Sequence, residues 1–155
     1  MQLSRPHLAA LARIGFGMLW AIDASFKWMP GFIGGHTLAD QFAKATTIHT
    51  PVVHQMLELN KAFAAADAQA FAVTIAVVET IVAIMLILGV ASRAAFIGSA
   101  LLSLGIWIGA EGMHLPWYSP GQTDLGPSAG YVFASLALLA SDAGSRWSVD
   151  ALRRR

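Results

Sequence analysis

The sequence has few charged residues and no cysteine, and these two shortages narrow the classes of protein to which it can belong. Asp, Glu, Lys and Arg make up only 12% of its 155 residues, whereas 56% are hydrophobic. A soluble domain carries about a quarter of its residues as charges, so this composition favours a protein whose surface faces lipid. Because cysteine is absent, the chain by itself offers no disulfide, thiolate nucleophile or iron–sulfur ligand.

The chain also lacks a strong charge of either sign. Its formal net charge is +1, so no basic field favours nucleic acid, and we expect no nucleic-acid partner. What the chain does have is a mean hydropathy of +0.59, with eight Phe and five Trp that suit anchoring at lipid headgroups. We therefore expect an all-α integral membrane protein with the lipid bilayer as its main partner.

Four apolar stretches approach the length of a membrane-spanning helix, which needs about 20 mostly apolar residues. They are predicted at about 8–29, 71–91, 94–110 and 127–142. The first contains three charges, and a cleaved signal peptide is the alternative for it. Because Arg13 interrupts its apolar core and no small-residue cleavage motif precedes its charged end, we expect it to be retained as a helix.

Basic residues indicate the orientation, since Lys and Arg are enriched in cytoplasmic loops. They precede the first stretch, occupy the turn between the second and third, and follow the fourth: Arg5, Arg93, Arg146 and residues 153–155. The opposite loops contain only Lys44 and Lys61. This pattern predicts one domain over residues 1–155, a four-helix bundle that crosses the inner membrane four times with both termini in the cytoplasm.

The long segment between the first two stretches, residues 30–70, contains a helix signal of its own. Thr50 and Pro51 are typical of an N-cap followed by proline at the first helical position. Apolar residues such as Val52 and Leu57 give the following residues one hydrophobic side. We predict an amphipathic helix that lies flat on the outer membrane surface or folds over the bundle.

Charges within spanning segments are costly, so they usually face the bundle interior, pair and serve function. At 100° per residue, Arg13, Trp20, Asp23 and Lys27 share one face of the first helix, and Asp23 and Lys27 have the spacing at which opposite charges meet. Glu79 is the single charge of the second stretch. It would lie roughly 12 Å below the outer end of its helix.

Further acidic residues stand near the same outer side. Glu111 closes the third stretch and Asp124 precedes the fourth. We therefore expect Lys27 and four carboxyl groups to converge in one pocket toward the outer face: those of Asp23, Glu79, Glu111 and Asp124.

Structural roles remain open for several of these residues. Asp23 and Lys27 could form a purely structural pair, and Glu111 and Asp124 could cap helix ends. Arg13 could extend its guanidinium toward the cytoplasmic surface. Two tryptophans could be anchors at the membrane interface, namely Trp107 and Trp117.

Four histidines fall on the expected outer side and raise the alternative of a metal such as copper: His36, His49, His54 and His114. His49 and His54 are five residues apart with Pro51 between them, which suits one helical face poorly. No cysteine and no HxxxH pair supports them. We therefore predict no metal and no covalent cofactor.

Several motifs resemble the DoxX/DoxD-like family of membrane proteins. The first helix reads RIGFGMLWAIDASFKWMPGF, and the second helix with its turn reads VETIVAIMLILGVASRAA. The third helix ends in WIGAEG, and TDLGPSAGY introduces the fourth. The last two are similar to the DoxD branch, the small subunit of thiosulfate:quinone oxidoreductase.

This resemblance implies a four-helix membrane subunit of a redox-linked complex that interacts with quinone and needs a partner subunit. Matching positions carry over eight residues: Arg13, Lys27, Glu79, Arg93, Trp107, Glu111, Asp124 and Tyr131. A quinone head stacked near Trp107 and Trp117 would take protons from Glu79 or Glu111. Lys27 would stabilise charge on the reduced ring or attract an anionic sulfur substrate.

The predicted site therefore has two groups of residues. The predicted catalytic residues are Lys27, Glu79, Glu111 and Asp124. The predicted substrate- or quinone-binding residues are Arg13, Asp23, Trp107, Trp117 and Tyr131. The expected partners are other membrane or extracytoplasmic subunits, or further copies of the chain.

A non-catalytic role is the alternative, as a membrane anchor or assembly subunit whose charges fix helix register or hold a partner's loop. A carrier of small solutes is a third possibility. It is disfavoured because four helices leave little room for two alternating halves and the sequence shows no inverted repeat.

Overall fold

The computed structural model describes residues 4–35, 37–38, 51–111, 113 and 125–153. Within these ranges every regular element is a helix, as the composition predicted. The helices are α1 (Arg5–Lys27), α2 (Pro30–Ile33), α4 (Pro51–Leu88), α5 (Ser92–Gly109), α6 (Pro127–Ala140) and α7 (Val149–Arg153).

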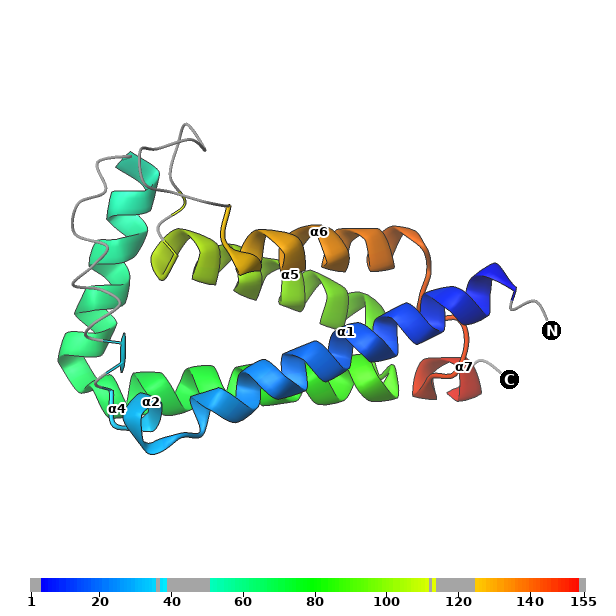
Figure 1. The fold of residues 1–155 in the computed structure, drawn as a ribbon, viewed down its shortest axis with the longest axis horizontal. Helices are drawn as coiled ribbons and strands as arrows, with labels where there is room; N and C mark the ends of the chain where they lie inside the picture. The colour runs from blue at the N-terminus through cyan, green and yellow to red at the C-terminus, as the bar shows by residue number, and fades with distance from the viewer. Residues whose placement is uncertain (1–3, 36, 39–50, 112, 114–124, 154–155) are drawn as a thin grey trace.

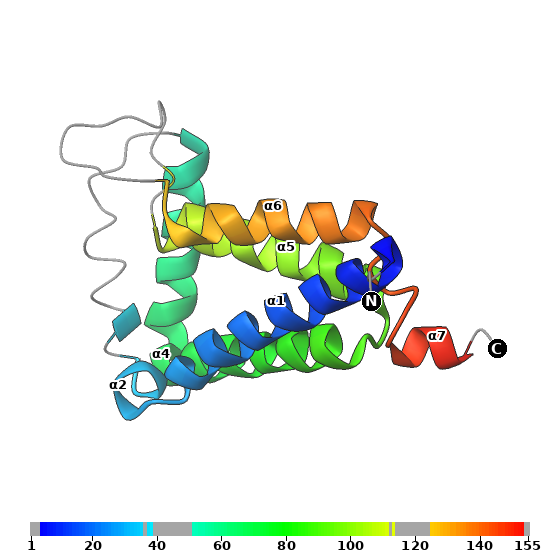
Figure 2. The same ribbon diagram turned by 45° about the vertical axis from the view of Figure 1, so that its right-hand side comes forward.

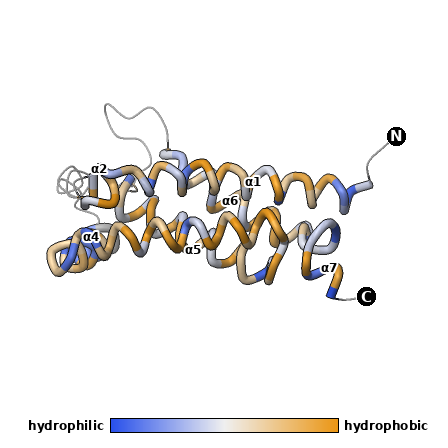
Figure 3. Tube along the Cα trace, turned by 90° about the horizontal axis from the view of Figure 1, so that it is seen from below, coloured by the Kyte–Doolittle hydropathy of each residue, from blue (hydrophilic) through white to orange (hydrophobic). Residues whose placement is uncertain are grey.

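Three of these helices contain stretches that are long and apolar enough to cross a membrane. The stretches are Arg5–Lys27, His54–Leu88 and Ser92–Gly109, and α6 is a shorter apolar helix. Many large apolar side chains point outward, with Leu101 64% and Phe133 63% exposed. Hydrophobic residues run along the length of α1, α4 and α5 (Figure 3). A surface of this kind is expected for a protein in contact with lipid, so the structure supports a membrane protein.

The long helices are arranged as two pairs (Figures 1 and 2). α1 packs along the second half of α4, α5 packs along α6, and α4 also contacts α5. The N-terminus, the turn between α4 and α5, and α7 lie at one end of the molecule. Toward the other end, where α2 lies, the two pairs diverge in both views.

A bend at Asp67 divides α4. The backbone of Asp67 is extended (φ −161°, ψ 97°) in the middle of an otherwise continuous helix. Its carboxylate accepts a hydrogen bond from the amide of Ala70 at 2.9 Å, which caps the second half of the helix. The first half, which begins at the predicted Pro51, runs across the end of the helix pairs (Figure 1). The apolar stretch predicted at 71–91 is thus the second half of a longer, bent helix that ends at Leu88.

The core contains polar links between helices as well as apolar contacts. Trp20 of α1 is fully buried, and it packs in one cluster with Leu86 of α4 and Phe96 of α5. Its indole N–H donates to the hydroxyl of Ser99 at 2.9 Å, and this hydroxyl lies 2.8 Å from that of Ser135 in α6. Because buried polar groups need partners, this chain of hydrogen bonds fixes α1, α5 and α6 relative to one another.

Side chains from both termini hold the end of the molecule that contains the α4–α5 turn. The guanidinium of Arg13 donates to the carbonyls of Leu86 (2.9 Å) and Trp147 (2.6 Å). The carboxylate of Asp150 accepts from the amides of Ala91 (2.9 Å) and Ser92 (2.6 Å). These bonds satisfy backbone groups that helix ends otherwise leave without partners.

Gly89 makes this end possible, and its replacement tests the arrangement. It has a φ of +65°, and a Cβ at this position would meet the Arg13 guanidinium and Ser148. We expect Gly89→Ala to lower the free energy of unfolding by about 1–3 kcal/mol. Gly98→Ala is the matched control, because a Cβ there meets nothing within 4 Å. Thermal unfolding of both variants in one detergent checks this, and equal midpoints would contradict the role of Gly89.

Candidate functional site

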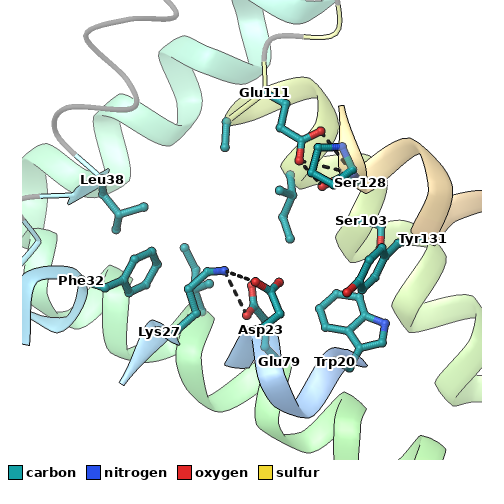
Figure 4. A pocket seen from close by; sticks show the side chains of 14 residues that line it. Trp20, Asp23, Lys27, Phe32, Leu38, Glu79, Ser103, Glu111, Ser128 and Tyr131 are labelled. Carbon is teal, nitrogen blue, oxygen red and sulfur yellow. Dashed lines mark hydrogen bonds and ion pairs between the residues drawn. The ribbon is translucent and has the colours of Figure 1, made fainter. Parts of the chain in front are cut away.

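A cavity of about 230 Å³ lies between the diverging helix pairs. Residues of α1, α2, α4, α5 and α6 line it, so it forms only when all of these elements are assembled. Figure 4 shows polar side chains on two sides of it, with aromatic and apolar side chains between them. A hollow of this size and lining is the usual setting of a small-molecule site.

An ion cluster occupies the side of the cavity formed by α1 and α4. The ammonium of Lys27 lies 3.3 Å from a carboxylate oxygen of Asp23 and 3.4 Å from one of Glu79 (Figure 4). The Asp23 side chain is 40% exposed and that of Lys27 19%, whereas Glu79 is fully buried. The cation therefore bridges a carboxylate one turn earlier on its own helix and a buried carboxylate on the neighbouring one.

The surroundings of Glu79 leave much of its hydrogen-bonding capacity unused. Apart from its ion pair with Lys27, neither carboxylate oxygen has a hydrogen-bond partner among the described residues. The hydroxyl of Ser103, which is 1% exposed and lines the same cavity, also has no hydrogen-bond partner among the described residues. Because a buried polar group without a partner is costly, these two groups indicate a cavity suited to a polar ligand.

A third carboxyl group, Glu111, faces the cavity from the opposite side (Figure 4). Its carboxylate accepts from the Ser128 hydroxyl at 2.6 Å and from the Ser128 amide at 3.2 and 3.3 Å. Ser128 is at the start of α6, where an anion is favoured by the helix dipole. Glu111 therefore caps the start of α6, which is the structural role that the sequence left open, and it also lines the cavity.

Aromatic rings form a further wall. The rings of Trp20 and Tyr131 meet edge to face, with centroids 5.2 Å apart at 82°, and both line the cavity. The Lys27 ammonium lies 5.5 Å from the ring centroid of Phe32, close enough for a cation–π interaction. A flat ligand would therefore meet aromatic faces and edges next to the ion cluster.

The charges of the lining select between ligands. Among the described residues, three carboxyl groups face the cavity and one ammonium accompanies them: Asp23, Glu79, Glu111 and Lys27. The ammonium is already paired with two of the carboxylates. An anion entering the cavity would meet uncompensated negative charge at short range, so the lining favours a neutral or cationic ligand.

The structure brings together five of the nine predicted site residues: Asp23, Lys27, Glu79, Glu111 and Tyr131. Arg13 was predicted to lie in the same site as Lys27, but it does not line this cavity. Its guanidinium instead donates to backbone carbonyls at the end of the molecule that contains the α4–α5 turn. Trp107 is buried in α5 and is not part of the lining either. Trp117 and Asp124 lie outside the described residues. So do all but one of the histidines considered for a metal, and His54 is exposed.

The polar and aromatic lining residues that the predicted site did not include are Trp20, Phe32, Ser103 and Ser128. The sequence placed Trp20 on the charged face of α1, and this position could have identified it as a lining residue. Ser103 comes four residues after Ser99 and so shares its helix face, but the direction of that face was not readable from the sequence.

The pairing of Lys27 with Glu79 can be tested with a double-mutant cycle. We expect Lys27→Met to lower the free energy of unfolding by about 3 kcal/mol, because it leaves a buried carboxylate without its cation. Lys27→Met/Glu79→Gln should recover most of this loss. Thermal unfolding of the wild type, both single variants and the double variant measures the coupling, and simple addition of the two losses would show that the pair does not interact.

Comparisons of this chain with protein-family models, with curated proteins and with solved structures find no match. The geometry of the cavity is therefore the main basis for a functional conclusion.

Proposed function

We propose that the protein is a multi-pass membrane subunit of a redox-linked complex and that its cavity binds a quinone head group. The observation on which this rests is Lys27, held between Asp23 and the fully buried Glu79 at the wall of the cavity. Ionisable groups buried within membrane segments are costly and are usually retained for function. The resemblance to DoxD-type subunits supports the same class of ligand.

The proposed topology has four crossings with both termini in the cytoplasm. It is supported by the position of the N-terminus, the α4–α5 turn and α7 at one end of the molecule (Figures 1 and 2). Arg5 begins α1, Arg93 is in the first turn of α5, and Arg146 precedes α7. Basic residues in such positions favour the cytoplasmic side. The cavity would then open toward the outer half of the membrane, with the first half of α4 across that end.

A quinone head fits the donors and the charge balance of the cavity. It is neutral, so it avoids the repulsion that the excess of carboxyl groups would impose on an anionic sulfur substrate. Its two carbonyl oxygens need hydrogen-bond donors, and Lys27, Ser103 and Tyr131 supply an ammonium and two hydroxyls. Trp20 and Tyr131, in place of Trp107, form the aromatic wall for the ring among the described residues.

The residues suit proton delivery more than electron storage. Reduction of a quinone to a quinol consumes two electrons and two protons, and the electrons would come from an electron-donating partner subunit. Glu79 and Asp23 lie within one ion cluster and could each hold a proton beside the ring. Lys27 would stabilise the charge that develops on the ring oxygen as electrons arrive.

An anchor or assembly subunit is the second candidate, and one observation favours it. The contacts of Glu111 with Ser128, and of Lys27 with Glu79, also fix α6 against α5 and α1 against α4. Charges used only for register would leave a complex active after substitution. Co-purification with a partner at fixed stoichiometry, with activity unaffected by changes at Lys27 or Glu79, is the result that this candidate predicts.

The topology can be tested directly because the chain has no cysteine. Ser4 precedes α1 and Gln69 follows the bend of α4, and both residues are exposed. We expect a membrane-impermeant maleimide to label Gln69→Cys in intact cells or spheroplasts and Ser4→Cys only after the membrane is permeabilised. The reverse pattern would contradict the proposed orientation, and labelling of both variants from the same side would contradict a crossing by α1.

The proton role can be tested by replacing Glu79. We expect Glu79→Gln to lower quinone-dependent turnover of the complex purified through this chain by about a hundredfold or more, with normal membrane insertion. Glu58→Gln is the matched control on α4, because Glu58 is exposed and pairs with Lys61 at 2.7 Å. Lipid extracts of the same wild-type preparation should contain quinone. Full turnover in Glu79→Gln would discard the proposal.

A further inference from the structure

A second hollow, of about 250 Å³, lies between α4 and α5. Its walls come from both halves of α4 and from one side of α5, and among the lining residues only Asn60 is polar. α4 and α5 diverge in this direction in both ribbon views (Figures 1 and 2). We call this hollow the apolar cleft. Its lining suits hydrocarbon and offers almost nothing to a polar ligand.

The apolar cleft adjoins the cavity that contains the ion cluster. The two linings share four residues: Leu38, Ile75, Ile106 and Ala110. Among the described residues, these four side chains therefore separate a polar compartment from an apolar one. A small movement of them would join the compartments into one site with a polar head end and an apolar tail end.

Glycines on α5 keep the apolar cleft open. A Cβ on Gly105 would meet no atom within 4 Å, so the space beside this residue is empty of neighbouring side chains. One turn later, the amide of Asn60 approaches Gly109 too closely for any Cβ there. Leu101, one turn before Gly105, also lines the cleft and is 64% exposed. The cleft thus reaches from the ion-cluster cavity to the outward, lipid-facing side of α5.

We propose that the apolar cleft holds the hydrocarbon tail of the ligand whose head group occupies the cavity. The ligand is then an amphiphile with an uncharged polar head, and it enters sideways from the lipid between α4 and α5. This inference rests on the proposed function for the identity of the head. It adds the tail, its path and the residues that line the path, which the head-group cavity alone does not define.

The inference favours a tail over other occupants of the cleft because of this continuity. A polar solute would gain no favourable contact from the apolar lining. A docked protein helix would need to bury much more apolar surface than a hollow of about 250 Å³ offers. A chain of methylene or isoprenoid units matches the apolar lining of the cleft. The tail would favour the cleft over bulk lipid because it packs closely against fixed walls there.

The test compares two probes, a benzoquinone without a side chain and the same ring with a decyl chain. Binding is measured on the purified protein in lipid nanodiscs. Gly105→Leu places a side chain in the cleft without touching the head-group cavity, because Gly105 lines the cleft alone. We expect it to weaken decyl-quinone binding at least tenfold and to leave the ring-only probe unchanged.

Gly98→Leu is the matched control, two turns earlier on α5. It also adds a leucine where a Cβ meets nothing within 4 Å, and Gly98 lines neither hollow. It should alter the binding of neither probe. Met56→Trp narrows the cleft from the α4 side, so it replaces Gly105→Leu if that variant fails to fold, with the same expected loss for the decyl probe.

A photoreactive diazirine at the end of the decyl chain gives a second readout. Cross-links to the α4 and α5 residues of the cleft are expected in the wild type and lost in Gly105→Leu. Equal decyl-quinone affinities in Gly105→Leu and Gly98→Leu, or cross-links outside the cleft, would overturn the tail site while leaving the proposed function in place. Failure of the wild type to bind either probe would overturn the proposed function, and the tail site with it.

Discussion

The ion pair between Lys27 and Glu79 is the interaction on which the rest of the structure depends. It joins the last turn of α1 to the second half of α4 and places a fully buried carboxylate beside its cation. A buried charge is tolerable only with a partner of opposite charge, so the pair fixes how α1 and α4 can slide and rotate against each other. That alignment sets the position of the cavity wall, of Asp23 and of the adjoining apolar cleft.

The two ends of the molecule differ in what their polar side chains bind. At the end with the α4–α5 turn, guanidinium and carboxylate groups bind backbone carbonyls and amides and so fasten the helix ends to one another. At the other end α4 bends at Asp67, the helix pairs diverge, and two hollows remain between them. Lys27 and Glu79 there face a cavity instead of a helix terminus, which is the arrangement expected where binding rather than rigidity is needed.

Much of this could be predicted from the sequence, because lipid imposes strong rules on a short chain. Long apolar stretches identify α1, the second half of α4 and α5. The spacing of Asp23 and Lys27, with the depth of Glu79, places the three groups at one level. Their meeting in one cavity follows if α1 and α4 pack side by side, as they do.

Other features could not be predicted, and each has a physical reason. Arg13 shares the face of Lys27, but it lies almost four turns away, about 21 Å along the axis, so a helical wheel groups residues that never meet. Ser103 and Trp107 lie one turn apart on the same buried face of α5, but only Ser103 lines the cavity. Which of the two does so depends on how far along α5 the neighbouring helices pack, and the sequence does not show this. The break at Asp67 is a single residue whose carboxylate competes with the helix for a backbone amide.

The hydrogen bond from Arg13 to the carbonyl of Trp147 joins residues that are 134 positions apart. A ribosome delivers the chain from its N-terminus, so this guanidinium enters the membrane region long before its acceptor exists. Until residues 147–150 are made, the end of the molecule with the α4–α5 turn lacks both this acceptor and the Asp150 carboxylate that holds the start of α5. Completion of the fold therefore waits for the synthesis of residues 147–150, which fasten helices that were made earlier.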